Sequence, residues 1–111
     1  MTKAPAIFAQ VCKSHGLPEP VAEYRFHSVR KWRMDWAFPA FKVALEIDGG
    51  VWTGGAHGRG TGIVRDQEKH NYAACMGWIT IRCVPKDMLK SETFAFLKAA
   101  MKVNATKTPS P

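Results

Sequence analysis

Apolar residues recur at helical spacing in three stretches of the chain, and the stretches close at residues that commonly end helices. The first stretch carries Ile7, Phe8 and Val11 on one face and stops at Gly16, and the second stops at Gly77. The third precedes a short polar tail that contains two prolines. We therefore expect helices over residues 5–15, 63–76 and 92–103.

Between these stretches, short segments rich in aromatic and β-branched residues indicate strands. Three of them follow one another after the first helix and predict an antiparallel meander. A fourth follows the second helix, and a helical crossover implies that it joins the sheet in parallel. The expected strands cover residues 21–27, 31–38, 42–48 and 78–84. The pattern predicts an α/β fold in which a mixed four-stranded sheet is flanked by helices.

A chain of 111 residues is the size of one compact domain. We expect that domain to cover residues 1–105 and to end in a frayed tail at residues 106–111. Most of the nine glycines fall within residues 49–62, which predicts a flexible loop long enough to wrap around a ligand. The composition, 46% hydrophobic and 23% charged, is typical of a globular protein and excludes a disordered tail or linker.

The three cysteines, Cys12, Cys75 and Cys83, lie far apart and lack the spacing of a zinc ribbon or a disulfide framework. We expect them to be reduced core residues. No apolar run approaches the roughly 20 residues that span a bilayer, and the N-terminal residues show no signal pattern. These features predict a cytoplasmic protein that does not enter membranes.

The chain has 16 basic and nine acidic residues, a formal net charge of +7, and a pI of about 9.6. A balance this basic favours a polyanionic partner such as nucleic acid. Charge alone does not identify that partner, since many basic proteins bind no nucleic acid. The stronger indication comes from acidic residues placed in apolar strands.

Three carboxylates, Asp35, Glu46 and Asp48, stand in the otherwise apolar second and third expected strands. Because side chains alternate along a strand, Glu46 and Asp48 share one face. A two-residue loop at residues 40–41 places Asp35 opposite Glu46. Opposed like charges destabilise a sheet unless something positive lies between them, and carboxylate oxygens suit Mg²⁺ or Mn²⁺. Such a site is equipped for phosphodiester hydrolysis.

Any one of these carboxylates, taken alone, is more simply an ordinary strand-end or solvent-facing residue. The case for a site depends on their agreement with the strand pattern, the basic charge and the glycine-rich loop.

This combination resembles the PD-(D/E)XK nuclease superfamily, whose core has the same αβββαβ order with one acid on the second strand and another on the third. More narrowly, the chain is similar to the small branch that contains very-short-patch mismatch repair endonucleases and related phage and bacterial proteins. The resemblance covers roughly residues 20–85. The segments that carry it are Arg33-Met34-Asp35-Trp36-Ala37, Leu45-Glu46-Ile47-Asp48-Gly49-Gly50-Val51-Trp52, the helix with Arg65, Asp66 and Lys69, and Gly77-Trp78-Ile79-Thr80-Ile81-Arg82.

The resemblance implies that Asp35 and Glu46 are metal ligands. Asp48 stands where the family has a lysine, so it is either a further metal ligand or the group that orients the attacking water. A cation from elsewhere would then replace that lysine. Lys69 on the second helix is the first candidate, and Lys42 on the third strand is the second.

Glu23, on the first expected strand, matches an additional acid that related nucleases bring near the metal, although a solvent-facing glutamate explains it equally well. Five basic residues near the strands and the glycine-rich loop are expected to contact DNA phosphates. These are Arg30, Lys31, Arg33, Arg59 and Arg65.

The resemblance therefore implies an Mg²⁺- or Mn²⁺-dependent DNA endonuclease. A small domain has little surface for reading a long sequence, so branched, nicked or mismatched DNA is the expected substrate. A Holliday-junction resolvase of the phage type and a nickase, acting in recombination or repair, both remain open, and a homodimer would supply two cuts. The alternatives are a non-catalytic DNA-binding module on a degenerate nuclease core, which the missing lysine favours, and a protein-interaction domain.

Overall fold

The computed structural model describes residues 5–48 and 61–106, so the glycine-rich segment before residue 61 and the last five residues lie outside the described part. The predicted element order is confirmed, and a short 3₁₀ helix, η2, is added after the last strand. Thr106, expected in the tail, belongs to the last helix. The elements are α1 (Pro5–Ser14), β1 (Val21–Tyr24), β2 (Met34–Phe38), β3 (Val43–Ile47), α2 (Thr61–Cys75), β4 (Ile79–Cys83), η2 (Pro85–Asp87) and α3 (Ser91–Thr106).

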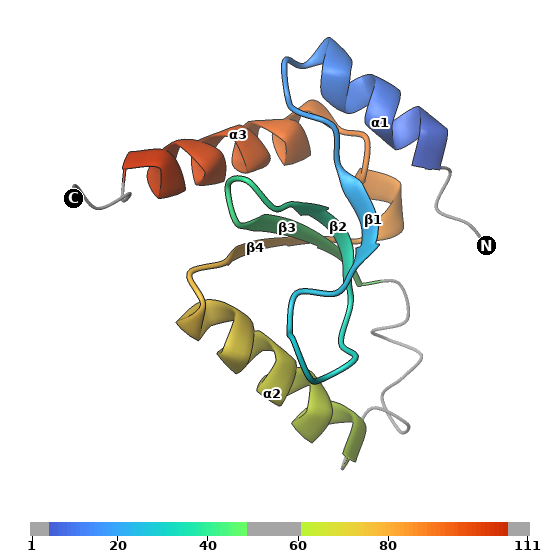
Figure 1. The fold of residues 1–111 in the computed structure, drawn as a ribbon. Helices are drawn as coiled ribbons and strands as arrows, with labels where there is room; N and C mark the ends of the chain where they lie inside the picture. The colour runs from blue at the N-terminus through green and yellow to red at the C-terminus, as the bar shows by residue number, and fades with distance from the viewer. Residues whose placement is uncertain (1–4, 49–60, 107–111) are drawn as a thin grey trace.

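The four strands form one mixed sheet in the order β1-β2-β3-β4. The first three strands pair antiparallel, and β4 pairs with β3 in parallel. Figure 1 shows α1 and α3 on one face of this sheet and α2 on the other. The predicted α/β class, with a mixed four-stranded sheet flanked by helices, is therefore confirmed.

The loop between β1 and β2 is longer than expected, because the strands end at Tyr24 and resume at Met34 instead of meeting near residue 30. Within this loop the His27 Nδ1 atom accepts hydrogen bonds from the main-chain N–H groups of Val29 and Arg30, at 3.1 and 3.0 Å. His27, which the prediction placed at the end of a strand, thus satisfies two main-chain donors of the loop with its side chain. The basic residues of the loop are consequently displayed at the edge of the sheet.

The turn between β2 and β3 spans residues 39–42, four residues instead of the two expected. Lys42 adopts a left-handed φ of 55° in this turn, which delays the start of β3 by one residue. The strands nevertheless pair in the expected register, and that register brings Asp35 level with Glu46. Asp35 and Glu46 therefore lie opposite each other as predicted, although the turn between β2 and β3 is longer than predicted.

The larger hydrophobic core lies between the sheet and the pair α1 and α3, where Phe8 packs on Trp36 and Phe94 with ring centroids 4.6 and 5.7 Å apart. Cys12 is buried in this core, which raises the pKa of its thiol to about 12. The expectation that all three cysteines are core residues is wrong for Cys75, which is exposed on α2. No helix within the described residues is long and apolar enough to cross a bilayer.

Truncating Phe94 should therefore cost much of the stability of this small domain. Phe94 is fully buried, so Phe94→Ala is expected to lower the free energy of unfolding by about 3–5 kcal/mol in urea denaturation. Phe96, two residues further along α3, is 62% exposed, and Phe96→Ala should change it by less than about 0.5 kcal/mol. Equal losses in the two variants would contradict the assigned core.

Candidate active site on the α2 face of the sheet

Three charged side chains form a level row across the sheet on the face covered by α2. Trp36 and Leu45 belong to the core on the other face, so their neighbours Asp35 and Glu46 face α2. Glu46 pairs in parallel register with Arg82 of β4, which extends the row to a third strand. Two acidic side chains and one arginine side chain thus lie next to one another across β2, β3 and β4.

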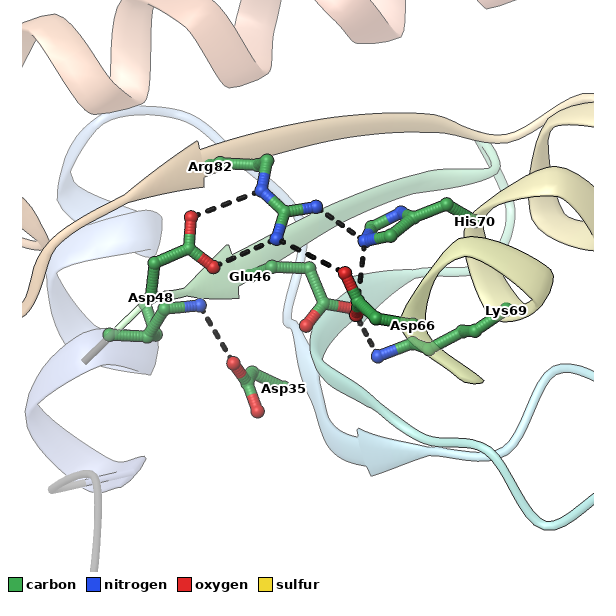
Figure 2. Close-up of polar contacts among 8 residues, drawn as sticks. Asp35, Glu46, Asp48, Asp66, Lys69, His70 and Arg82 are labelled. Carbon is green, nitrogen blue, oxygen red and sulfur yellow. Dashed lines mark hydrogen bonds and ion pairs between the residues drawn. The ribbon is translucent and has the colours of Figure 1, made fainter. Parts of the chain in front are cut away.

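The two acids of this row are held by different partners. One carboxylate oxygen of Asp35 accepts a hydrogen bond from the main-chain N–H of Ile47 at 2.7 Å. A carboxylate oxygen of Glu46 lies 2.9 Å from the Nζ atom of Lys69, which reaches down from α2 (Figure 2). The side chains of this ion pair are only 10% and 15% exposed. Glu46 and Lys69 therefore form a largely buried ion pair next to Asp35.

Burial raises the pKa of Glu46 above its usual value, and the neighbouring charge of Asp35 raises it further, whereas Lys69 lowers it. The raised pKa means that the folded state holds this proton more tightly than the unfolded state. The contribution of Glu46 to stability is therefore lost as the pH rises through this raised pKa, so the ionised carboxylate is a cost at neutral pH. An added positive charge near the two acids would offset that cost.

Arg82 stands at the centre of a second set of contacts that the sequence analysis did not foresee. Its Nε and Nη2 atoms donate to the two carboxylate oxygens of Asp48, each at 3.0 Å. Its Nη1 atom contacts the Nε2 atom of His70, and Nη2 lies 4.0 Å from a carboxylate oxygen of Asp66 (Figure 2). The residue after β3 and two residues of α2 are thereby joined to β4 around one guanidinium.

His70 takes part in this network as a neutral acceptor. Burial lowers the pKa of His70, and the positive charge of Arg82 lowers it further, although Asp66 acts in the opposite direction. Because a guanidinium only donates hydrogen bonds, the Nε2 atom of His70 accepts from Arg82. The other ring nitrogen then carries the proton.

Two other predicted site residues lie in different surroundings. Glu23 is level with Asp35 on the neighbouring strand, but its carboxylate is exposed and lies 3.7 Å from a guanidinium nitrogen of Arg33. The Lys42 ammonium donates to the main-chain oxygen of Met76, just beyond the end of α2, at 2.9 Å. The structure thus brings Lys69, and not Lys42, to the acids.

The expected phosphate contacts in the β1–β2 loop are exposed or partly exposed. Arg30 lies 3.1 Å from a carboxylate oxygen of Glu68 on α2, and its guanidinium carbon stacks 4.1 Å from the centroid of the Trp32 ring. Lys31 is exposed and makes no ion pair with any residue in the described ranges. The other two expected phosphate contacts are Arg59 and Arg65. Arg59 lies outside the described residues, and so does the side chain of Arg65.

Acidic side chains outnumber basic ones among the described residues of this site, and a divalent cation favours such a composition. Four carboxylates and two cations meet here. The carboxylates are Asp35, Glu46, Asp48 and Asp66, and the cations are Lys69 and Arg82.

The side chains that could coordinate a metal ion are fewer than the charged residues of the site. Within residues 5–48 and 61–106, no three histidine, cysteine or acidic side chains converge at metal-ligand spacing. Asp35 and Glu46 offer two hard oxygen ligands, whereas the oxygens of Asp48 are bound by Arg82. Mg²⁺ is usually bound by one or two carboxylates together with water and substrate phosphate, so two carboxylates fit it. The assignment of Asp48 as a third ligand stays a prediction.

Comparisons with models of known protein families, with curated proteins and with solved structures found no match.

Proposed function

We propose that this protein is a metal-dependent DNA endonuclease with a PD-(D/E)XK-type core, and that its site is formed by Asp35, Glu46 and Lys69. The observation that carries the proposal is the enclosed contact of 2.9 Å between Glu46 and a lysine from α2, beside a second acid on the adjacent strand. Two acids and a lysine are the residue types that the resemblance to PD-(D/E)XK nucleases implies for the site. Here the lysine comes from a helix instead of from the strand.

Asp35 and Glu46 are the residues that would hold Mg²⁺ or Mn²⁺. Such an ion lowers the pKa of a bound water and stabilises the negative charge that develops on the phosphate. The hydrogen bond from the main-chain N–H of Ile47 fixes one oxygen of Asp35, and so orients this carboxylate on the face that α2 covers. The position of both acids is set by the register of β2 and β3 and does not depend on a loop.

Lys69 supplies the positive charge that the strand lacks at residue 48. Its ammonium lies against Glu46 in a largely enclosed position, where water screens its charge little. A positive charge fixed in such a place stabilises a developing phosphate charge without reorganising in the reaction. Lys69 is therefore the residue that we assign to the role of the motif lysine.

The basic β1–β2 loop supports DNA as the substrate, and it yields a prediction for binding. Lys31→Ala should weaken DNA binding on all sequences alike and reduce the slope of log affinity against log salt by about one unit. Lys98→Ala, which removes the same charge from α3 on the other face of the sheet, should leave that slope unchanged. A fluorescence-anisotropy titration at several salt concentrations measures both. Identical slopes for Lys31→Ala and wild type would place the DNA elsewhere.

The basic charge and the small size of the domain favour DNA that is branched, nicked or mismatched over a long recognition sequence. A phage-type Holliday-junction resolvase and a nickase both fit, and a homodimer would supply two cuts. A cytoplasmic location, in a bacterium or a phage-infected host, agrees with this substrate.

One observation favours a second candidate, a DNA-binding module without catalysis. The acids already have protein cations as partners, Lys69 for Glu46 and Arg82 for Asp48, as in a core that no longer uses a metal. Supercoiled, linear and four-way-junction DNA, incubated with Mg²⁺, Mn²⁺ or EDTA, separates the candidates. The nuclease cuts at least one of them with a metal, the binding module retains DNA without cutting it, and a protein-interaction domain does neither.

A further inference from the structure

Arg82 differs from Lys69 in being open to a ligand. Its side chain is 42% exposed, whereas Lys69 is 15% exposed and in contact with Glu46. A guanidinium has five N–H donors, and the contacts to Asp48 and His70 use three of them. Two N–H groups of a solvent-accessible arginine therefore make no hydrogen bond within the described residues, one on Nη1 and one on Nη2, the latter 4.0 Å from Asp66. Arg82 is paired with Glu46 in the register of β3 and β4.

The orientation of this guanidinium is fixed from two sides. Asp48 binds its Nε and Nη2 atoms side-on, with both oxygens at 3.0 Å, and the Asp48 main-chain N–H is itself tied to Cys83 at 2.8 Å. On the other side, His70 of α2 contacts Nη1. Figure 2 shows Asp48 turned toward Arg82. An arginine held in this way has little freedom left to lose when it binds an anion.

We propose that Arg82 binds a DNA phosphate next to the acid pair, and that Asp48 is the residue that positions Arg82 instead of a metal ligand. This inference rests on the proposed nuclease function, because it assigns the substrate phosphate to a place in that site. The planar fork of an arginine matches phosphate oxygens better than an ammonium does. A phosphate on Arg82 lies beside Glu46, where the scissile bond has to be.

The first test measures DNA affinity in EDTA, where no cleavage intervenes, with a labelled four-way junction and a labelled duplex. Arg82→Ala should weaken binding about tenfold, the loss typical of one charge-assisted hydrogen-bond pair, and reduce the salt slope by about one unit. Arg82→Lys keeps the charge and should restore the salt slope but only part of the affinity, because an ammonium lacks the planar fork. Lys98→Ala serves as the charge-matched control on the opposite face. Wild-type affinity in Arg82→Ala would overturn the assignment.

The second test separates positioning from metal binding. Asp48→Asn should keep the rise in melting temperature that Mn²⁺ gives the wild type, whereas Asp35→Asn should lose it. The same Asp48→Asn variant should bind DNA at least as tightly as wild type, because a negative charge is removed, and yet cleave about tenfold more slowly. Loss of the Mn²⁺ response in Asp48→Asn would show that Asp48 is a metal ligand and would overturn the proposal.

Failure of this inference is distinguishable from failure of the proposed function. If the wild type cuts DNA with Mn²⁺ but Arg82→Ala binds and cuts normally, the nuclease assignment stands and the role of Arg82 is wrong. If the wild type neither binds nor cuts any of the DNAs, both are wrong.

Discussion

Asp35→Asn is expected to abolish metal-dependent DNA cleavage, with a loss of at least about 10²–10³ in rate, while the protein stays folded. The asparagine keeps an oxygen that can accept the hydrogen bond from Ile47, so the local structure of β2 and β3 should survive. It removes the negative charge that the acid pair presents to a cation. The rate is measured with labelled junction DNA under single-turnover conditions.

The stability of the same variant adds a second, independent result. Removing one of two neighbouring negative charges relieves repulsion, so in EDTA the melting temperature of Asp35→Asn should be equal to or above that of the wild type. Adding Mn²⁺ should raise the melting temperature of the wild type only, since a ligand stabilises the state that binds it. Glu92→Gln, an exposed acid on α3, is the control and should behave as wild type in both assays. Undiminished cleavage by Asp35→Asn would remove Asp35 from the site.

Lys69→Ala is expected to slow cleavage by about 10²–10³ while changing DNA affinity by no more than a few fold. The reason is the position of the ammonium, which is enclosed against Glu46 and so contributes to the reacting site more than to the DNA surface. The effect should therefore appear in kcat and not in KM.

Lys42→Ala is the matched control for this prediction. The Lys42 ammonium is bound to the main-chain oxygen of Met76, beyond the end of α2, and has no contact with the acids. Its loss should leave the cleavage rate near that of the wild type. A wild-type rate in Lys69→Ala, or an equal loss in the two lysine variants, would show that no lysine has taken over the role missing at residue 48.

The sheet and the acid pair could be predicted because they depend on local pattern. Alternation of apolar and polar residues sets which face Asp35 and Glu46 occupy, and the short connection between β2 and β3 leaves few registers open. Helical periodicity likewise indicated that Lys69 belongs to the helix that crosses the sheet. These expectations survived a turn that is two residues longer than predicted, because the added residues do not change the pairing.

The partners of Asp48 could not be predicted in the same way. Its contact with Arg82 depends on the parallel register of β3 and β4, which are joined through α2 and a long connection that imposes no register. The ends of β1 and β2 also differ from the prediction, because the chain leaves the sheet after Tyr24, and the side chain of His27 binds main-chain N–H groups within the loop. The exposure of Cys75 depends on which side of α2 meets the sheet, and an α2 of mixed polarity does not specify that side.

The most direct test of the central claim is the cleavage of supercoiled plasmid by the wild-type protein and by Glu46→Gln, purified in parallel and assayed with Mn²⁺ and with EDTA. The account predicts nicked or linear plasmid from the wild type with Mn²⁺ only, and none from Glu46→Gln under either condition. Cleavage by the wild type in EDTA, or equal cleavage by the two proteins with Mn²⁺, would contradict it.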